Sequence, residues 1–376
     1  MVNIFLNGLN AKAGGGKSIL NNYLTLLIEK ASDKLFFVLT PDAEEYRKYE
    51  TDWVKIVDIP AIYKNKLAFP LVYSTVVPRL LKQLKIDLVF NLSDIPLKTN
   101  IRQIFLFDWS YAVYPHSIVW QMMTGKDFIV RKIKLFYFKR YLKYIDLIVA
   151  QTDTMKAKLT ELFNCPHVIV VPNAVSLENM EGGEKEEFGL PKGTKLLYLT
   201  HYYPHKNLEI FIPLAQEIKK KNLDYKLITT IDPDQHADAK KFLDNIVKLD
   251  IGDVICNVGA VTMKHVPSLY KQCDGLLMPT LLESFSGTYV EAMYHKIPIF
   301  TSDIDFAKGV CYDGAEYFNP MDIHSILEKL DTVYLNEKKK KELVLRATRI
   351  LDSLPDWNQV ITMYSNIIEK VLKNGN

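Results

Sequence analysis

Gly275-Leu-Leu-Met-Pro-Thr280, followed closely by Glu283-Ser-Phe-Ser-Gly-Thr-Tyr-Val-Glu291, is the stretch of sequence that best indicates the fold. The first run is short and apolar, as a buried strand is, and residues 289–294 have the pattern of the first turns of a helix. Ile297-Pro-Ile-Phe-Thr301 predicts the next strand. A strand, a loop of small residues and a helix N-terminus in this order make a ready anion site.

The two glutamates of this stretch predict what the anion belongs to. Backbone N–H groups around Ser286, Gly287 and Thr288 would have no partner within the helix, and the helix dipole there favours phosphate. A carboxylate beside a phosphate needs a reason, because repulsion alone would weaken binding. Glu283, in the loop, could face a group that becomes positive during a reaction. Glu291, one turn into the helix, could accept hydrogen bonds from ribose hydroxyls, so the stretch predicts a nucleotide-sugar site.

Length and composition limit the classes of protein. A chain of 376 residues is long for one core and predicts two domains. A net charge of +3 gives no overall signature of nucleic-acid binding. The four cysteines form no CxxC pair, which argues against a zinc site or a disulfide framework and fits a reducing compartment. The sequence shows no signal peptide and no apolar run of the roughly 18 residues that a membrane span needs. We expect a cytoplasmic protein, either soluble or peripheral on the inner membrane face.

A run of glycines follows the first predicted strand, residues 2–7. Gly14-Gly15-Gly16-Lys17-Ser18 precedes a predicted helix and suggests the P-loop of a kinase or ATPase, but that motif needs glycine where Ala11 stands. We therefore predict a flexible glycine loop ahead of the helix, where the backbone can approach a phosphate or sugar closely.

Strand and helix patterns alternate through the first half of the chain, which predicts a parallel sheet covered by helices on both faces. Ligands of such sheets bind at the carboxyl ends of strands. Two polar segments fall there, at residues 91–94 and 107–111. Asp108 lies in the second segment. It either caps a helix or turn, or contacts the substrate.

Several of these segments together resemble one enzyme family. Glu283 and Glu291 around a Ser-Phe-x-Gly loop look like the E-x7-E motif of the retaining family-four glycosyltransferases, which have the GT-B fold. Asp108 resembles the aspartate of the family's His-Asp segment, although Phe107 replaces the histidine. Lys206-Asn207 resembles the donor-diphosphate segment, with His201 and His205 in place of the usual arginine. The resemblance covers most of the chain, from the glycine run to Trp357.

The resemblance implies two doubly wound, Rossmann-like domains facing a cleft. The N-terminal, acceptor-binding domain would span residues 1–175, the donor domain 176–354, and a helix over 355–376 would cross back to the first domain. Lys206 and the helix starting near Gly287 would hold the diphosphate, Glu291 the ribose, and Glu283 would lie near the transferred sugar. The catalytic candidates that the resemblance implies are Glu283, Lys206 and Asp108, the last from the opposite domain. The remaining donor-site candidates are Gly259 and Val261 beside the base, His201 and His205 beside the phosphates, and Gly15 and Gly16 from the opposite domain. No metal and no cofactor are expected, since basic residues and a helix dipole take the place of a metal ion.

The segment Arg131 to Tyr144 is rich in basic and aromatic residues and contains no acidic one. On a helix, Lys132, Lys139, Arg140 and Lys143 gather on one side, and Ile133, Tyr137, Tyr141 and Tyr144 line another. Such stripes suit an anionic membrane surface, and they equally suit a core-packed helix with a solvated basic face.

The function predicted for the chain is transfer of a hexose from a nucleotide-diphosphate sugar to a glycan or lipid-linked acceptor in surface-polysaccharide assembly. Two alternatives stay open. One is a P-loop kinase using Gly16-Lys17-Ser18. The other is a GT-B-shaped scaffold without catalysis, suggested by Phe107 and the missing arginine.

Overall fold

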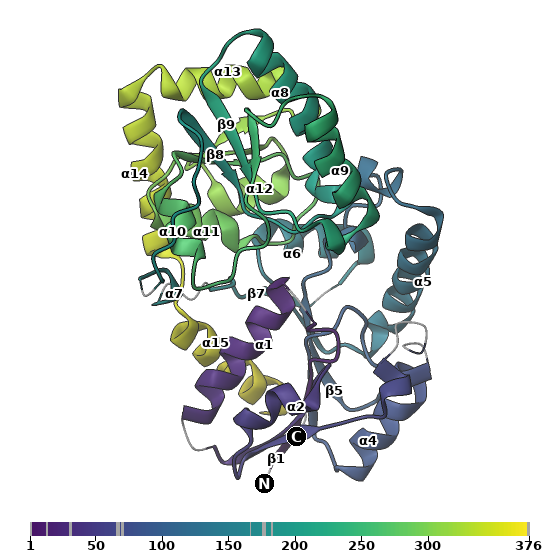
Figure 1. Cartoon of the computed structure of the whole chain (residues 1–376). Coiled ribbons are helices and arrows are strands. Elements are labelled where there is room, and N and C mark those ends of the chain that lie inside the picture. The colour runs from purple at the N-terminus through teal and green to yellow at the C-terminus, as the bar shows by residue number, and fades with distance from the viewer. Residues whose placement is uncertain are drawn as a thin grey trace. The chain divides into compact units, whose positions relative to one another are not determined.

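The computed structural model describes residues 2–12, 14–29, 32–64, 68, 71–165, 167–174, 178–181 and 183–373. The chain forms two compact units (Figure 1). The first comprises residues 1–113, 124–174 and 355–376, and the second comprises residues 114–123 and 175–354. In the described residues, no helix is both long enough and apolar enough to cross a membrane.

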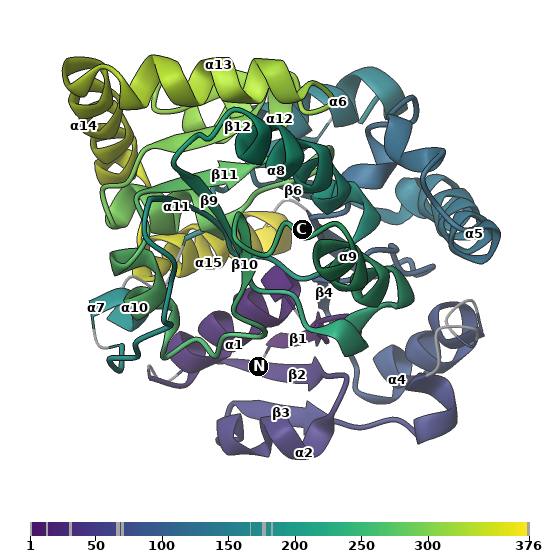
Figure 2. The same cartoon turned by 45° about the horizontal axis from the view of Figure 1, so that its top comes forward.

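The first unit is built on a seven-stranded parallel sheet, in the order β3-β2-β1-β4-β5-β6-β7. Figure 2 shows β3, β2 and β1 side by side. Its strands are β1 (Val2–Asn7), β2 (Lys34–Leu39), β3 (Val54–Val57), β4 (Leu88–Asn91), β5 (Arg102–Phe107), β6 (Leu147–Ala150) and β7 (Val168–Val170). Strand order reverses between β1 and β4, and the loops at such a point form the usual ligand crevice of a doubly wound sheet.

Alternate residues of β1 show why helices cover both faces of this sheet. Ile4 and Leu6 are buried in one apolar cluster, and Phe5 is buried in another on the opposite face. The first cluster includes residues of α1 and α15, and the second includes residues of the segment that ends in α4. The helices of this unit are α1 (Gly14–Glu29), α2 (Ala43–Tyr46), α4 (Val77–Gln83, after a π-turn at Val72–Val76), α5 (Gly125–Tyr141), α6 (Asp153–Phe163) and α15 (Trp357–Lys373).

Helix α15 packs into the first unit through aromatic contacts. The ring of Tyr364 lies 6.0 Å from that of Tyr23 in α1 and 5.1 Å from that of Phe90 in β4. Arg102 of β5 also donates hydrogen bonds to two carbonyl groups near the end of α15, those of Val371 and Leu372, at 2.7 and 2.6 Å.

The second unit holds a six-stranded parallel sheet, in the order β10-β9-β8-β11-β12-β13. Its strands are β8 (Thr194–Tyr198), β9 (Tyr225–Thr229), β10 (Ile255–Asn257), β11 (Gly275–Met278), β12 (Ile299–Ser302) and β13 (Glu316–Phe318). Its helices are α7 (Glu178–Glu181), α8 (Phe211–Lys220), α9 (Ala237–Lys248), α10 (Val266–Lys271), α11 (Gly287–Tyr294), α12 (Asp305–Cys311), α13 (Ile323–Tyr334) and α14 (Glu337–Ser353). The two parallel sheets confirm the predicted fold class, and this sheet reverses its order between β8 and β11.

The glycine run of the first unit differs from the prediction. Gly14, Gly15 and Gly16 form the first turn of α1 rather than a flexible loop before it. Glycine is a poor helix former, but tertiary packing overrides propensity. Here Leu20 and Leu24, further along α1, are completely buried against the sheet. Lys17 then lies within the helix, where its Nζ is 2.7 Å from Oε1 of Glu45. The early helix start shortens the glycine loop that would have to surround a phosphate, which argues against the P-loop alternative.

Helix α5 also differs from the prediction. The rings of Tyr137, Tyr141 and Tyr144 lie in a row, 5.6 and 6.0 Å apart, as the expected line predicts. The line is not uniformly buried, because Ile133 is exposed while Tyr141 is buried. The helix ends at Tyr141, and Lys143 and Tyr144 lie in the 3-10 turn that follows, Leu142–Tyr144.

The segment 114–123 is covalently flanked by the first unit on both sides but packs into the second. The hydroxyl of Tyr114 donates a 2.5 Å hydrogen bond to Oδ1 of Asp305 in α12, and its ring lies edge-on to Phe306 at 6.2 Å. Trp120 Nε1 donates to the carbonyl of Tyr114 at 2.9 Å, which closes the segment on itself.

Candidate functional site

The predicted donor residues of the second unit gather where its strand order reverses. Lys206 ends the 3-10 turn Pro204–Lys206 that follows β8, and Glu283 lies in the loop that follows β11. Because β8 and β11 are neighbours in the sheet, the two loops emerge from the same edge. Nζ of Lys206 and Oε1 of Glu283 form an ion pair, with side chains only 16% and 12% exposed. The structure therefore brings together two predicted catalytic residues that are distant in sequence.

Backbone contacts between the two loops hold this ion pair in place. The N–H of Leu281 donates to the carbonyl of His205 at 2.7 Å, and the hydroxyl of Tyr198 donates to the carbonyl of Lys206 at 2.9 Å. Thr280 Oγ1 lies 3.2 Å from the carbonyl oxygen of His205 and 3.3 Å from Oε1 of Glu283, so its one proton is placed to be donated to either. Buried hydroxyl and carbonyl groups are thus paired, and the position of each charged side chain is set by its loop.

Asn207 stabilises the loop after β8 through its backbone conformation and its side-chain hydrogen bonds. It has a left-handed backbone conformation, with φ of 56°, and it is buried. Its side-chain Nδ2 donates to the carbonyls of Pro320 and Pro279, at 2.8 and 3.2 Å. Asparagine tolerates this backbone region better than most residues and here also supplies two donors. The pairing explains in physical terms why an asparagine follows Lys206.

Glu291 is buried in the first turns of α11 and contacts Tyr270, which the sequence did not indicate as a site residue. The hydroxyl of Tyr270, in α10, donates a 3.0 Å hydrogen bond to Oε2 of Glu291. Burial raises the pKa of Glu291, and the hydrogen bond from Tyr270 opposes that rise. The ring of His295 stacks on Tyr270 at 4.9 Å. No signal in the sequence near Tyr270 could have identified this contact, because the pair depends on how α10 packs against α11.

The N-terminus of α11 lies next to the ion pair along the chain. Ser286 is its N-cap with extended backbone, and within the described chain its side chain makes no capping hydrogen bond. The first N–H groups of a helix have no partner within that helix, so those of Gly287 and Thr288 are suited to an anion. Helix start and loop agree with the prediction from sequence to within a residue or two.

The remaining donor candidates occupy loops at the same edge of the sheet. His201 has its Nδ1 2.8 Å from Nε2 of Gln235, and the ring of His205 stacks on Tyr203 at 5.4 Å. Gly259 follows β10 with φ of 76°, a conformation that favours glycine, and Val261 lies two residues further along.

In the first unit, Asp108 immediately follows β5 and lies beside the start of α1. A methyl group built onto Gly16 would lie 3.9 Å from Oδ2 of Asp108. Oδ1 of Asp108 is sealed from solvent and has no hydrogen-bond partner among the described residues. Burial, with a smaller contribution from the charge of Asp94, raises the pKa of Asp108 to about 7, while Lys134 acts in the opposite direction. Phe107, in place of the family's histidine, is fully buried in β5 against Phe138, at 5.8 Å, and takes no part in the site.

The side chains that act on Asp108 were not predicted from the sequence. Asp94 lies in one of the two polar segments expected at the carboxyl edge of the sheet, but it was given no role. Lys134 belongs to the basic helix, and its ion pair with Asp94 turns it inward. Counting charges along α5 could not separate Lys134 from its exposed neighbours, because basic residues occur on several sides of that helix.

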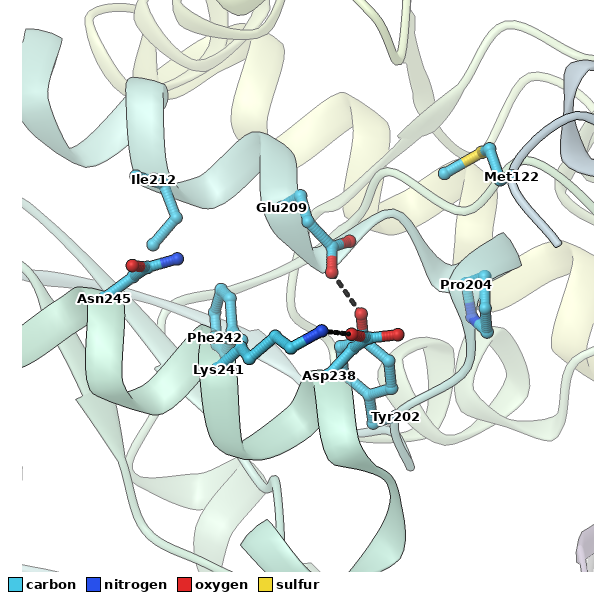
Figure 3. A pocket seen from close by; sticks show the side chains of 9 residues that line it. All are labelled: Met122, Tyr202, Pro204, Glu209, Ile212, Asp238, Lys241, Phe242 and Asn245. Carbon is cyan, nitrogen blue, oxygen red and sulfur yellow. Dashed lines mark hydrogen bonds and ion pairs between the residues drawn. The ribbon is translucent and has the colours of Figure 1, made fainter. Parts of the chain in front are cut away.

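A pocket of about 300 Å³ lies beside α8 and α9, away from these residues (Figure 3). Tyr202, Glu209, Asp238 and Lys241 line it, and the figure shows Lys241 turned toward Asp238, 2.7 Å away. It includes none of Lys206, Glu283 and Glu291 and shares with them only the loop after β8. For metals, the described residues contain no group of three or more His, Cys, Asp or Glu side chains placed to hold an ion.

Comparison with known proteins gives matches over both halves of the chain. The model of Glycosyltransferase Family 4 matches residues 30–179, and that of Glycosyl transferases group 1 matches residues 183–349. The O-antigen chain mannosyltransferase RfbU of Salmonella typhimurium is 23% identical over 63% of this chain and 61% of its own length. The alignment thus spans about three fifths of that relative.

Two solved structures have the same fold over the whole chain. The sucrose-phosphate synthase of Thermosynechococcus elongatus is 12% identical and superposes over 100% of both chains with a TM-score of 0.75. HepE of Anabaena, solved in complex with UDP-glucose, is 14% identical and superposes over 98% of this chain and 100% of its own, with a TM-score of 0.70.

At these identities the superpositions establish the fold, and the two family models together establish the family. The two models follow one another along the chain, one in each half, and each half contains one of the two parallel sheets. The chain belongs to the family-four-like glycosyltransferases of the GT-B fold.

Proposed function

We propose that this glycosyltransferase moves a hexosyl group from a nucleotide-diphosphate sugar to a glycan or lipid-linked acceptor during surface-polysaccharide assembly, with retention of configuration. The observation that carries the proposal is the Lys206–Glu283 ion pair at the reversal point of the second sheet, followed in the same loop by the N-terminus of α11. The cationic side chain of Lys206 and the N-terminus of α11 suit the phosphate groups of a nucleotide sugar, and the carboxylate of Glu283 suits the transferred sugar.

The diphosphate would bind Lys206 and the first N–H groups of α11. Departure of the nucleoside diphosphate leaves negative charge on the leaving oxygen, and a prepositioned cation with helix N–H groups stabilises such charge. The ion pair gives Lys206 a partner in the absence of donor, so its Nζ would exchange the carboxylate for phosphate oxygens when the donor binds. Glu283 would then be free to face the transferred sugar, where positive charge develops at the ring.

The nucleoside would bind alongside, with Glu291 accepting hydrogen bonds from the ribose hydroxyls. The hydrogen bond from Tyr270 opposes the rise in the pKa of Glu291 that burial causes, so it favours the charged carboxylate, which is the stronger hydrogen-bond acceptor. The left-handed turn at Gly259 would let the base approach the backbone closely. The complex of HepE with UDP-glucose is consistent with this class of donor.

The acceptor would be reached through the first unit, and the surface of α5 supports a lipid-linked one. Ile129, Ile133 and Phe136 are 58%, 48% and 61% exposed and lie one turn apart along one face of the helix. Exposed basic side chains flank this stripe, namely Lys132, Lys139 and Arg140. Apolar groups inside a basic border suit an anionic bilayer surface, and the relative RfbU acts, by its name, on a chain of O-antigen.

Thermal unfolding against a panel of UDP-, GDP- and ADP-sugars tests the donor site. A ligand that binds only the folded state raises the unfolding midpoint by mass action. We expect one nucleotide-sugar to raise it in the native protein and to have little effect on Glu291→Ala. Transfer to a saccharide acceptor should be abolished in Glu283→Ala, whose own midpoint should stay close to the native value.

Asp352→Ala, at an exposed position of α14 in the second unit, is a matched control that should behave like the native protein. Absence of any shift across the panel, or near-normal turnover by Glu283→Ala, would contradict the proposal. Anomeric configuration of the isolated product tests retention separately.

A further inference from the structure

Helix α5 has an inner face that carries two partly buried cations. Lys134 forms an ion pair with Asp94 from the loop after β4, and its Nζ lies 4.1 Å from the ring centre of Trp109. One turn earlier, the guanidinium of Arg131 lies 4.2 Å from the ring centre of Tyr111. Both aromatic residues belong to the segment that begins at Asp108. Cation–π contacts thus connect the inner face of α5 to the loop that carries Asp108.

Asp108 itself lies beside the start of α1, and its Oδ1 is buried without a hydrogen-bond partner among the described residues. The charged and titratable groups that face it come from three elements: Asp94 from the β4 loop, Lys134 from α5, and Tyr364 from α15. Arg131 acts more remotely, through Lys134. The first N–H groups of α1, at Gly14 to Gly16, lie on the remaining side and favour a negative charge.

The effects of Asp94 and Lys134 on Asp108 have opposite signs. Lys134 stabilises a negative carboxylate at Asp108, and Asp94 repels it. Because Lys134 and Asp94 form an ion pair, the charge of Asp94 partly cancels the effect of Lys134 on Asp108. Movement or loss of either partner changes the charge that Asp108 experiences.

We propose that Lys134 and Asp94 are positioning residues that set the charge of Asp108, so that transfer uses Asp108 as a carboxylate only while Lys134 faces it. The part of this inference that concerns transfer rests on the proposed function. Neither residue needs to contact a substrate, because each acts through Asp108. A purely structural role would predict a different result, namely loss of stability with an unchanged pH dependence.

The pH profile of transfer distinguishes the two roles. In Lys134→Met the pKa of Asp108 rises, so the acid limb of the kcat profile should move to higher pH, by about one pH unit. In Asp94→Asn the repulsion disappears and Lys134 is released toward Asp108, so the acid limb should move to lower pH. Lys156→Met, on an exposed position of α6 in the same unit, should leave the profile unchanged.

A second measurement needs no enzymatic activity. Because the folded-state pKa of Asp108 is raised, the folded protein holds its proton more tightly than the unfolded chain does between about pH 4, the usual Asp range, and pH 7. Its contribution to stability is present below that window and is lost as pH rises through it. Asp108→Asn cannot titrate, so its advantage in unfolding midpoint over the native protein should grow across the window and then level off.

The upper end of this window should move up in the Lys134→Met background and down in the Asp94→Asn background. Opposite displacements support the inference, and displacements of the same sign, or none, overturn it. If no donor supports transfer, the proposed function fails, while the stability titration still decides whether the pair sets the charge of Asp108. If transfer occurs and its acid limb is unmoved in both variants, transfer does not use Asp108 as a carboxylate.

Discussion

The hydroxyl of Tyr270 donates a 3.0 Å hydrogen bond to the buried carboxyl group of Glu291. This bond opposes the effect of burial, which raises the pKa of Glu291. The charge of a proposed ribose-binding residue is therefore supported by a side chain on a different helix, and the interaction can be removed without altering Glu291 itself.

Tyr270→Phe should weaken donor binding. Without the hydrogen bond the pKa of Glu291 rises further, a larger fraction of the carboxyl group is protonated at neutral pH, and it accepts hydrogen bonds less well. We expect the Kd of the nucleotide-sugar, measured by calorimetry, to rise about tenfold, which is about 1.4 kcal/mol.

Tyr225→Phe provides the matched control for this variant. It removes a similar 2.7 Å hydrogen bond, from Tyr225 to Asp331 in the same unit, and should reduce stability without changing the Kd. Equal effects of the two variants on the Kd would show that Tyr270 acts through general stability alone.

Lys206→Met should lower kcat about 10²- to 10³-fold, the usual effect of removing one group that stabilises a developing anion. It also leaves the nearly buried Glu283 without its cation, so the free energy of unfolding should fall by up to about 3 kcal/mol, the lower end for a broken buried pair. Adding Glu283→Gln should restore much of that stability and none of the activity. Denaturant unfolding and initial rates measure the two quantities, with Lys195→Met, which loses a more exposed pair to Asp274, as control. Recovery of turnover in the double variant would argue against both assigned roles.

The order of strand, loop and helix around Glu283 could be predicted because it depends on local sequence, namely short apolar runs and small residues. The ion pair of Glu283 with Lys206 was not predicted, although both residues were. Its prediction requires knowing that β8 and β11 are neighbours, and that order follows from packing of the whole sheet.

Two other errors have physical causes of the same kind. The first turn of α1 is made of glycines, which disfavour a helix locally but are held in one by the buried residues that follow. Lys134 looks like any other lysine of its helix in a charge count, and only the position of Asp94 on a neighbouring loop turns it inward. Local pattern predicted the elements, and long-range contacts decided which side chains meet.

Asn207 offers a way to separate backbone conformation from hydrogen bonding in the donor loop. Asn207→Gly keeps the left-handed φ at no steric cost but loses both side-chain hydrogen bonds, and Asn207→Ala adds about 1 kcal/mol or more of backbone strain to that loss. We expect both variants to be less stable than the native protein in denaturant, with Asn207→Ala the lower. Both should raise the donor Kd, because Lys206 precedes Asn207 in the same turn. A native Kd in Asn207→Gly would mean that the hydrogen bonds to Pro279 and Pro320 do not fix Lys206.

The exposed face of α5 should bind anionic vesicles. We expect the protein to sediment with vesicles containing phosphatidylglycerol and not with phosphatidylcholine alone, because each basic residue near such a surface contributes about 1 kcal/mol. Ile133→Ser with Phe136→Ser should remove binding that persists in high salt, since apolar insertion is not screened. Lys139→Glu with Arg140→Glu should remove binding at low salt.

Val247→Ser, an 81% exposed apolar position on α9 of the second unit, is the matched control and should sediment like the native protein. If all these variants sediment alike, the basic stripe of α5 is a solvated helix face, and the acceptor reaches the enzyme without help from a membrane contact at this helix.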